Sequence, residues 1–322
     1  MDKESIKELV REEMANMQQP VQRFYYFMSG LPRAGSTLLS AILNQNPRIY
    51  SGPSSPVVPT MLAVEQSLAQ DELFLAYPKQ QQATMIIANI LPQFYSDVNK
   101  PVIIDKNRSW VNRLHYIPGY FGIEPKVLCP VRNIDEILAS FIAMQRRNTY
   151  SNNNSKINFI DEMLIKNNIP LTDDNRCELL ANAQFGILGQ SYSGIRQALM
   201  EGRQKSLHFV EYDELLNNPD ETMRKVYEFL EEDNFKHDFT NIINIHREND
   251  EQVYGMADMH DVRSSLGRRG IDPKEILSEA TLEKCKNAEF WRNIDEAISS
   301  DEFQPDYETP KTTDEPASFI GA

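Results

Sequence analysis

The chain alternates short apolar runs with longer segments in which apolar residues recur every three or four positions. Four runs have the composition of buried strands, at residues 24–28, 101–105, 126–131 and 207–212. The periodic segments predict helices at 36–46, 60–69, 79–97, 110–121, 133–147, 159–167, 174–201, 220–231, 273–279 and 281–298. Short apolar strands separated by helices predict an α/β fold of three layers, with a short central parallel sheet flanked by helices.

Two stretches interrupt this pattern. Residues 50–59 hold Gly52 and three prolines, which predicts a turn-rich loop without lasting regular structure. Because this loop follows the first helix closely, we expect it to return over the ends of the strands. Beyond residue 240 the chain is punctuated by glycines and predicted to be irregular up to residue 270.

The division of the chain follows from the same pattern. Residues 1–21 are charged and periodic and predict a peripheral amphipathic helix, without the apolar centre of a signal peptide. Residues 22–299 form one predicted domain, and residues 300–322, rich in Pro, Thr and acid, predict a disordered acidic tail. No apolar run is long enough to span a membrane.

Charge and cysteine content narrow the classes of partner. The 33 basic and 47 acidic residues give a net charge of −14, which disfavours nucleic acid and anionic membranes as partners. An anionic ligand can then bind only where a few cations are gathered locally. The three cysteines have no paired spacing, so the sequence predicts neither a disulfide framework nor a metal site, and a reducing, cytoplasmic location is expected.

Candidate chemistry begins directly after the first strand. Gly30 and Gly35 frame a loop that leads into a helix, a geometry that directs backbone N–H groups and the positive helix end at an anion. The two glycines match the frame of a Walker A loop, but Ser36 stands where the lysine is expected, and the loop's cation is Arg33.

Polar residues also follow the other predicted strands. They are Lys106, Arg132 and Tyr212. Since the carboxyl ends of parallel strands meet at one edge of a sheet, these residues and Arg33 are expected to share one site.

Two motifs resemble those of the P-loop sulfotransferases. Pro32-Arg-Ala-Gly-Ser-Thr37 resembles the loop with which that family holds the 5′-phosphosulfate of 3′-phosphoadenosine 5′-phosphosulfate (PAPS). Arg132 with Ser140, eight residues on, resembles the family's signature for the 3′-phosphate. The layout is similar to that of bacterial and tyrosylprotein-type members. The resemblance implies a PAPS-dependent sulfotransferase that moves a sulfuryl group to a hydroxyl acceptor by in-line displacement, leaving PAP.

The resemblance also implies roles for single residues. Tyr212 is similar to the family's tyrosine after the fourth strand, and Lys106 stands at the place of its lysine after the second. Residues 259–263 and the basic stretch beyond them resemble a loop that closes over the cofactor. The implied cofactor-binding set is Arg33, Ala34, Gly35, Ser36, Thr37, Arg132, Ser140, Tyr212, Arg263, Arg268 and Arg269. Arg33 and Lys106 suit the task of stabilising the leaving phosphate and the equatorial oxygens.

One departure from the family concerns the general base. Tyrosylprotein sulfotransferases use a Glu in the loop after the first helix, and Ser54 occupies that position here. A serine hydroxyl cannot act as a base at neutral pH. His260, which is titratable near neutrality, is the first candidate for a catalytic base. Asp105 is the second candidate and His115 the third.

Two other functions remain open from the sequence. The first is an ATP-Mg-dependent kinase or NTPase, because residues 102–105 resemble a Walker B strand whose Asp105 would hold Mg²⁺. The second is a non-catalytic nucleotide-binding protein on the same scaffold, which the missing Glu favours.

The acceptor pocket is expected from residues 50–66, 148–160 and 254–270. The acidic balance of the chain favours an acceptor of low negative charge. The sequence leaves open the acceptor's identity, the oligomeric state, and whether the 148–160 loop is a lid.

Overall fold

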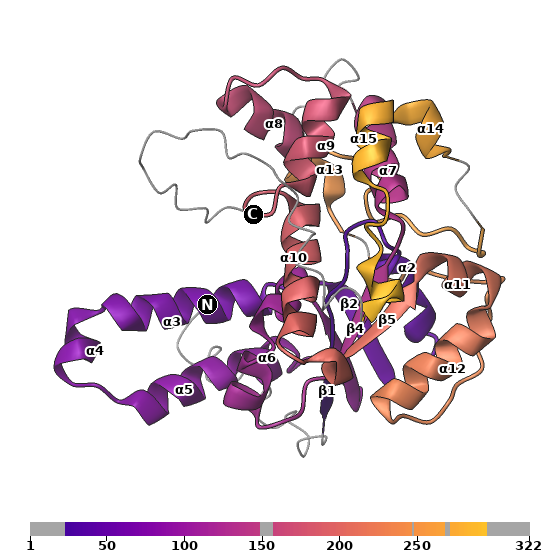
Figure 1. Cartoon of the computed structure of the whole chain (residues 1–322). Coiled ribbons are helices and arrows are strands. Elements are labelled where there is room, and N and C mark those ends of the chain that lie inside the picture. Colours follow the sequence, from indigo (N-terminus) through magenta and orange to yellow (C-terminus); the bar gives the residue numbers. More distant parts are fainter. Residues whose placement is uncertain (1–22, 149–156, 247, 268–270, 295–322) are drawn as a thin grey trace, which may run out of the picture.

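The computed structural model describes residues 23–148, 157–246, 248–267 and 271–294. Its centre is one five-stranded sheet in the order β2-β3-β1-β4-β5, with every neighbouring pair parallel (Figure 1). The strands are β1 Phe24–Met28, β2 Ile49–Ser54, β3 Val102–Lys106, β4 Val127–Val131 and β5 Leu207–Glu211. The predicted α/β fold with a short central parallel sheet is confirmed.

Helices cover both faces of the sheet because side chains alternate along each strand. Phe27 and Ile103 face one buried cluster, to which α7 and α10 contribute, whereas Met28 and Ile104 face a second cluster with α2 and α12. The helices are α2 Ser36–Leu43, α3 Val57–Gln70, α4 Glu72–Ala76, α5 Gln80–Ala88, α6 Ile90–Phe94, α7 Ile134–Arg147, α8 Phe159–Lys166, α9 Asp173–Ala181, α10 Ile187–Met200, α11 Tyr212–Asn217, α12 Pro219–Leu230, α13 Asp250–Tyr254, α14 Pro273–Ile276 and α15 Glu279–Lys284.

Strand β2 corrects the prediction for residues 50–59. The segment was predicted to be an irregular loop, but Ile49–Ser54 is a strand and α3 begins at Val57. The strand lies at the edge of the sheet and pairs only with β3, and its register shifts between Ser51 and Ser54. Pro53 is tolerated at that irregular edge, where a missing N–H group removes no bond from an inner ladder.

Several predicted helices are shorter or divided. The segment 79–97 forms α5 and α6. Within the described part of 281–298, α15 ends at Lys284 and the short turn Phe290–Arg292 follows. Residues 110–121 fall in a 3₁₀ helix, Arg108–Arg113, and a π-helical turn, Ile117–Phe121. The segment 174–201 is split into α9 and α10 by a bend at Gly186, where a Cβ atom would lie 2.2 Å from the carbonyl oxygen of Leu179. Helices α4, α11 and α13 were not predicted.

Two predicted segments lie outside the described residues. They are the N-terminal helix at 1–21 and the acidic tail at 300–322, so the division of the chain into these parts stays a prediction. Among the residues that the structure describes, no helix has the length and apolar character needed to cross a membrane.

Candidate active site

A cavity of about 1170 Å³ opens at the carboxyl ends of the strands. A residue at or just after each strand lines it: Arg33 after β1, Ser54 at the end of β2, Lys106 at the end of β3, Arg132 after β4 and Tyr212 after β5. The expectation that these positions share one site is therefore met in the geometry.

The loop between β1 and α2 presents an anion-binding geometry. Arg33 and Gly35 both have a positive φ, of 57° and 89°. Among the described residues no side chain caps the N-terminus of α2, and its first turn holds no acidic residue. Gly35, Ser36 and Thr37 line the cavity, so the first amides of this helix lie beside it.

The two sequence motifs contact each other directly. Arg33 Nε donates to Ser140 Oγ at 3.3 Å, and its Nη1 donates to the carbonyl oxygen of Met259. Arg132 Nη1 donates to the carbonyl oxygen of Arg33 at 3.4 Å. The Arg132 guanidinium also lies 4.5 Å from the centre of the Tyr212 ring. Residues 33, 132, 140 and 212 thus form one interlocked group.

Lys106 is the most deeply placed cation of the cavity. Its side chain is buried, and Nζ lies 3.7 Å from Glu248 Oε1. Burial lowers the pKa of the Lys106 amine from its ordinary value, and the nearby Glu248 carboxylate opposes that shift. The Glu248 carboxylate therefore favours the protonated, cationic form of Lys106 at the end of β3.

Arg108 also lines the cavity, and the sequence reasoning did not select it. Desolvation by the surrounding protein lowers the pKa of the Arg108 guanidinium from its ordinary value. Its turn is fixed by Ser29, whose Oγ donates to the Arg108 carbonyl oxygen at 2.7 Å and accepts from the Val111 amide at 3.0 Å. The position two residues after Lys106 was the available signal.

His260 is held by a carboxylate at the cavity wall. Its Nδ1 lies 2.6 Å from Asp250 Oδ1, and its backbone N–H donates to Asp250 Oδ2 at 2.8 Å. A carboxylate at Nδ1 favours the tautomer whose Nε2 can accept a proton. Asp250 was missed from the sequence, since ten residues of chain separate it from His260 and no local motif joins them.

Glu248 completes a group of acidic side chains at this histidine. Its Oε2 lies 3.5 Å from His260 Nδ1, and ligand atoms of Glu248, Asp250 and His260 lie within 4.8 Å of one another. These are ligand types that metals accept, although the sequence predicted no metal site. In this structure His260 lies beside both carboxylates, and Glu248 also pairs with Lys106.

The other two candidates for a base lie elsewhere. Asp105 is fully buried, where it accepts from Tyr95 Oη at 2.7 Å and from Trp110 Nε1 at 2.5 Å. His115 packs edge-on against Tyr116, with 4.7 Å between the ring centres. Neither is among the described residues that line the cavity. The geometry is therefore against both as bases, and against Asp105 as a ligand of Mg²⁺ in this cavity.

The remaining predicted cofactor-binding residues differ in where they lie relative to the cavity. Arg263 lines the cavity, whereas the side chain of Ala34 is buried in the core beneath the loop. Arg268 and Arg269 lie outside the described residues, as do residues 149–156 of the loop 148–160, whose role as a lid the sequence left open. Of the expected acceptor region, Tyr254 lines the cavity, and the walls contributed by α8 to α10 were only partly anticipated.

A family model described as "Sulfotransferase family" matches residues 26–236 of this sequence. The match spans more than half of the chain and contains both motifs of the cavity. The chain belongs to the sulfotransferase family. It is therefore an enzyme of sulfuryl transfer, and PAPS is the donor that this family uses.

Three individual proteins are similar to this chain in sequence or in structure. The protein-tyrosine sulfotransferase A of Caenorhabditis elegans is 22% identical over 312 residues, covering 83% of this chain and 75% of the relative. Among solved structures, sulfotransferase STF9 from Mycobacterium avium is similar at 12% identity and a TM-score of 0.43, covering 90% of this chain and 81% of that one. The sulfotransferase domain of the Synechococcus PCC 7002 olefin synthase has 16% identity and the same TM-score, with coverages of 86% and 98%.

The shape of the loop at Gly35 leads to a first prediction. A Cβ atom there would lie 2.8 Å from Tyr212 Cδ2, at a φ that side chains rarely adopt. Gly35→Ala should weaken binding of adenosine 3′,5′-bisphosphate about tenfold or more, since 1–3 kcal/mol of strain falls on the loop itself. Isothermal titration calorimetry measures this.

Gly122→Ala is the matched control. Gly122 also has a positive φ, of 65°, but nothing lies within 4 Å of its Cβ position, and it is remote in sequence from the loop. That variant should lose some stability and bind the bisphosphate as the wild type does. Equal affinities for all three proteins would show that the loop does not hold the nucleotide.

Proposed function

We propose that this sulfotransferase transfers the sulfuryl group to a hydroxyl acceptor by in-line displacement, with His260 as the general base. The observation that carries this proposal is that one cavity is lined both by the cations after β1, β3 and β4 and by a histidine held by a carboxylate. A hydroxyl acceptor of low negative charge suits a chain with a net charge of −14.

The donor fits the residues present. The amides at the start of α2 and the Arg33 guanidinium offer hydrogen bonds and charge to a phosphosulfate, and no acidic residue occupies the described first turn of that helix. Arg132 and Ser140 are the expected partners of the 3′-phosphate, and Arg263 lines the same cavity. Tyr212, already paired with Arg132, offers a ring for the nucleotide.

The reaction requires the protein to move one proton and to stabilise negative charge. PAPS supplies the sulfuryl group, whose bond to the phosphate oxygen breaks as a bond to the acceptor oxygen forms. Arg33 and Lys106 stabilise the negative charge of the leaving phosphate and the equatorial oxygens. His260 accepts the proton of the acceptor hydroxyl through Nε2, and the Asp250 carboxylate stabilises the imidazolium that results.

Both alternatives from the sequence are weakened by particular contacts. A Mg²⁺-dependent NTPase would use Asp105 as a ligand, but that carboxylate is bound by Tyr95 and Trp110 in the core. A non-catalytic protein has no need for a histidine oriented by a carboxylate beside the anion-binding loop. We further propose a reducing compartment such as the cytoplasm, since all three cysteines are free, buried thiols.

A thermal-shift experiment tests the class of nucleotide. Adenosine 3′,5′-bisphosphate at one hundred times its dissociation constant should stabilise the protein by about 2.7 kcal/mol, without added metal. ADP with Mg²⁺ at the same concentration should stabilise it less. A preference for ADP that depends on Mg²⁺ would refute the proposal in favour of the NTPase.

A further inference from the structure

The cavity has room for more than the donor. Single small-molecule sites occupy about 300–1000 Å³, and this cavity has a volume of about 1170 Å³. Its cationic lining comes from the loop after β1 and from the ends of β3 and β4. The lining continues beyond Ser140 onto α7, α8, α9 and α10, where its chemistry changes. Figure 1 shows α8 and α9 above the strands, whereas α11 and α12 lie to the right of them.

The second part of the lining is hydrocarbon. We call it the apolar wall, and it consists of Phe141, Phe159, Ile160, Met163, Leu179 and Ile187. Phe159, Met163, Leu179 and Ile187 are only partly buried, so apolar surface is left facing the cavity. Surface of this kind gains free energy when an apolar ligand covers it.

Polar groups at this end give no net charge to the wall. Glu162 and Lys166 stand one turn apart on α8 and have opposite charges, and Gln184 and Gln190 are neutral. All four side chains are exposed, so water can satisfy their hydrogen bonds without a ligand. Nothing in the described lining of this end selects a charged acceptor.

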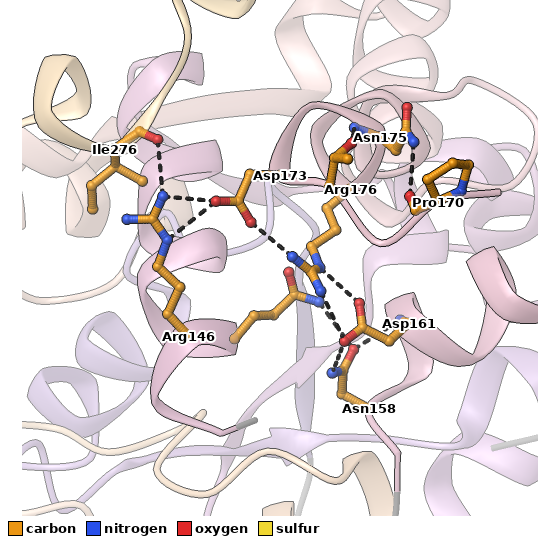
Figure 2. A network of polar contacts seen from close by, with 10 residues as sticks. Arg146, Asn158, Asp161, Pro170, Asp173, Asn175, Arg176 and Ile276 are labelled. Atoms are coloured by element: carbon orange, nitrogen blue, oxygen red, sulfur yellow. Dashed lines mark hydrogen bonds and ion pairs between the residues drawn. The ribbon is translucent and has the colours of Figure 1, made fainter. Parts of the chain in front are cut away.

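A polar network behind α8 holds the apolar wall in place (Figure 2). Asn158 caps the helix by accepting from the Asp161 amide at 2.9 Å, and the buried Gln145 of α7 donates to the same Asn158 oxygen at 3.0 Å. Arg176 of α9 binds Asp161 through Nε at 2.7 Å and Asp173 through Nη1 at 2.8 Å.

The network therefore joins α8 to both of its neighbours. Arg146 near the end of α7 donates to Asp173 at 2.7 Å, which ties α7 to α9 as well. The wall is thus a preorganised surface, and it can discriminate between acceptors by shape and polarity.

We infer that the acceptor is an alcohol or phenol whose body is an uncharged hydrocarbon packed against the apolar wall. The inference rests on the proposed function, because it names the acceptor class of the same site. A saccharide or an extended peptide would bring many polar groups to the apolar wall, whose hydrocarbon side chains cannot pair them, whereas a hydrocarbon body covers that wall at no such cost. His260, in the same cavity, would then meet the hydroxyl end.

The first test uses the wild-type enzyme and a series of primary alcohols from butanol to octanol. With saturating PAPS, kcat/KM for transfer of labelled sulfate should rise about fourfold for each added methylene. Glucose and an acidic tyrosine-containing peptide serve as polar acceptors and should react poorly. A flat dependence on chain length, or a preference for the sugar or the peptide, would overturn the inference.

The second test compares two substitutions on the same helix. Met163→Glu places a charge in the apolar wall and should lower kcat/KM for octanol about tenfold or more. Ile165→Glu is the control, because Ile165 is 49% exposed and lies outside the described lining of the cavity. That variant should behave as the wild type does.

Calorimetry with adenosine 3′,5′-bisphosphate distinguishes a wrong acceptor class from a wrong proposed function. The affinity should be the same in Met163→Glu and in the wild type. Weaker binding in the variant alone would mean that the wall holds the nucleoside, which overturns the inference and leaves sulfuryl transfer intact. A wild-type enzyme that binds no bisphosphate would instead refute the proposed function.

Discussion

Replacing Lys106 by methionine should slow sulfuryl transfer by about a hundredfold to a thousandfold while the protein stays folded. Lys106 is the buried cation at the end of β3, and it lines the cavity together with Arg33. Charge that develops on the transferring group inside a cavity is stabilised more strongly by such a cation than it would be in water. Methionine has a similar length and keeps the packing, so the loss reports on the charge. Single-turnover transfer of labelled sulfate measures it.

Two further variants test whether the slower transfer comes from loss of the Lys106 charge. Lys126→Met removes a lysine at the start of β4 whose Nζ lies 2.9 Å from Glu231, outside the described lining, and it should keep full activity. Lys106→Met with Glu248→Gln removes the carboxylate that the single variant leaves without its lysine. If the double variant recovers wild-type activity, the slow rate of Lys106→Met came from Glu248, and the catalytic role of Lys106 is wrong.

The sequence predicted the centre of the fold and the place of the site for one physical reason. Buried parallel strands are short apolar runs, and all of them end at the same edge of the sheet. The polar residue after each run was therefore visible as a member of one site, which Arg33, Lys106 and Tyr212 illustrate. The family resemblance then connected Arg132 with Ser140, which now lies within hydrogen-bonding distance of Arg33.

The wrong predictions of secondary structure have a common cause. They depend on contacts between distant residues, which the local pattern of apolar and polar positions does not encode. Strand β2 was hidden because Gly52 and Pro53 indicate a turn, yet an edge position tolerates them. The segment 174–201 was predicted to be one helix, but a turn divides it, in which Asn182 Oδ1 accepts from the amides of Gln184 and Phe185 and Gly186 lies close to the end of α9.

The polar partners were missed for the same reason. Asp105 has the sequence context of a Walker B residue, but Tyr95 and Trp110 bind it on the opposite side of the strand from Lys106. Asp250 and His260 are ten residues apart, and they come into contact only because the folded chain between them brings them together. Tertiary packing decides such pairs, and a single sequence does not display it.

Replacing His260 by glutamine should lower kcat by about 10²–10⁴ and should also change the pH dependence of the reaction. The proposed base works as neutral imidazole, so the wild-type rate should fall on the acid side as the ring takes up a proton. Glutamine has no such titration, so the acid limb should disappear from the residual activity. The pH–rate profiles of kcat for the two proteins, with PAPS and acceptor saturating, are the measurement.

Asp250→Asn separates orientation from proton transfer. It keeps a side chain of the same shape at His260 Nδ1 but removes the charge that stabilises the imidazolium, so kcat should fall while an acid limb persists. His115→Gln is the control, because His115 is exposed and lies outside the described lining of the cavity, and its profile should match the wild type. Since Glu248, Asp250 and His260 also offer metal-ligand atoms, the profiles should be repeated with EDTA. Activity that EDTA abolishes and Zn²⁺ restores, or an unchanged acid limb in His260→Gln, would exclude His260 as the base.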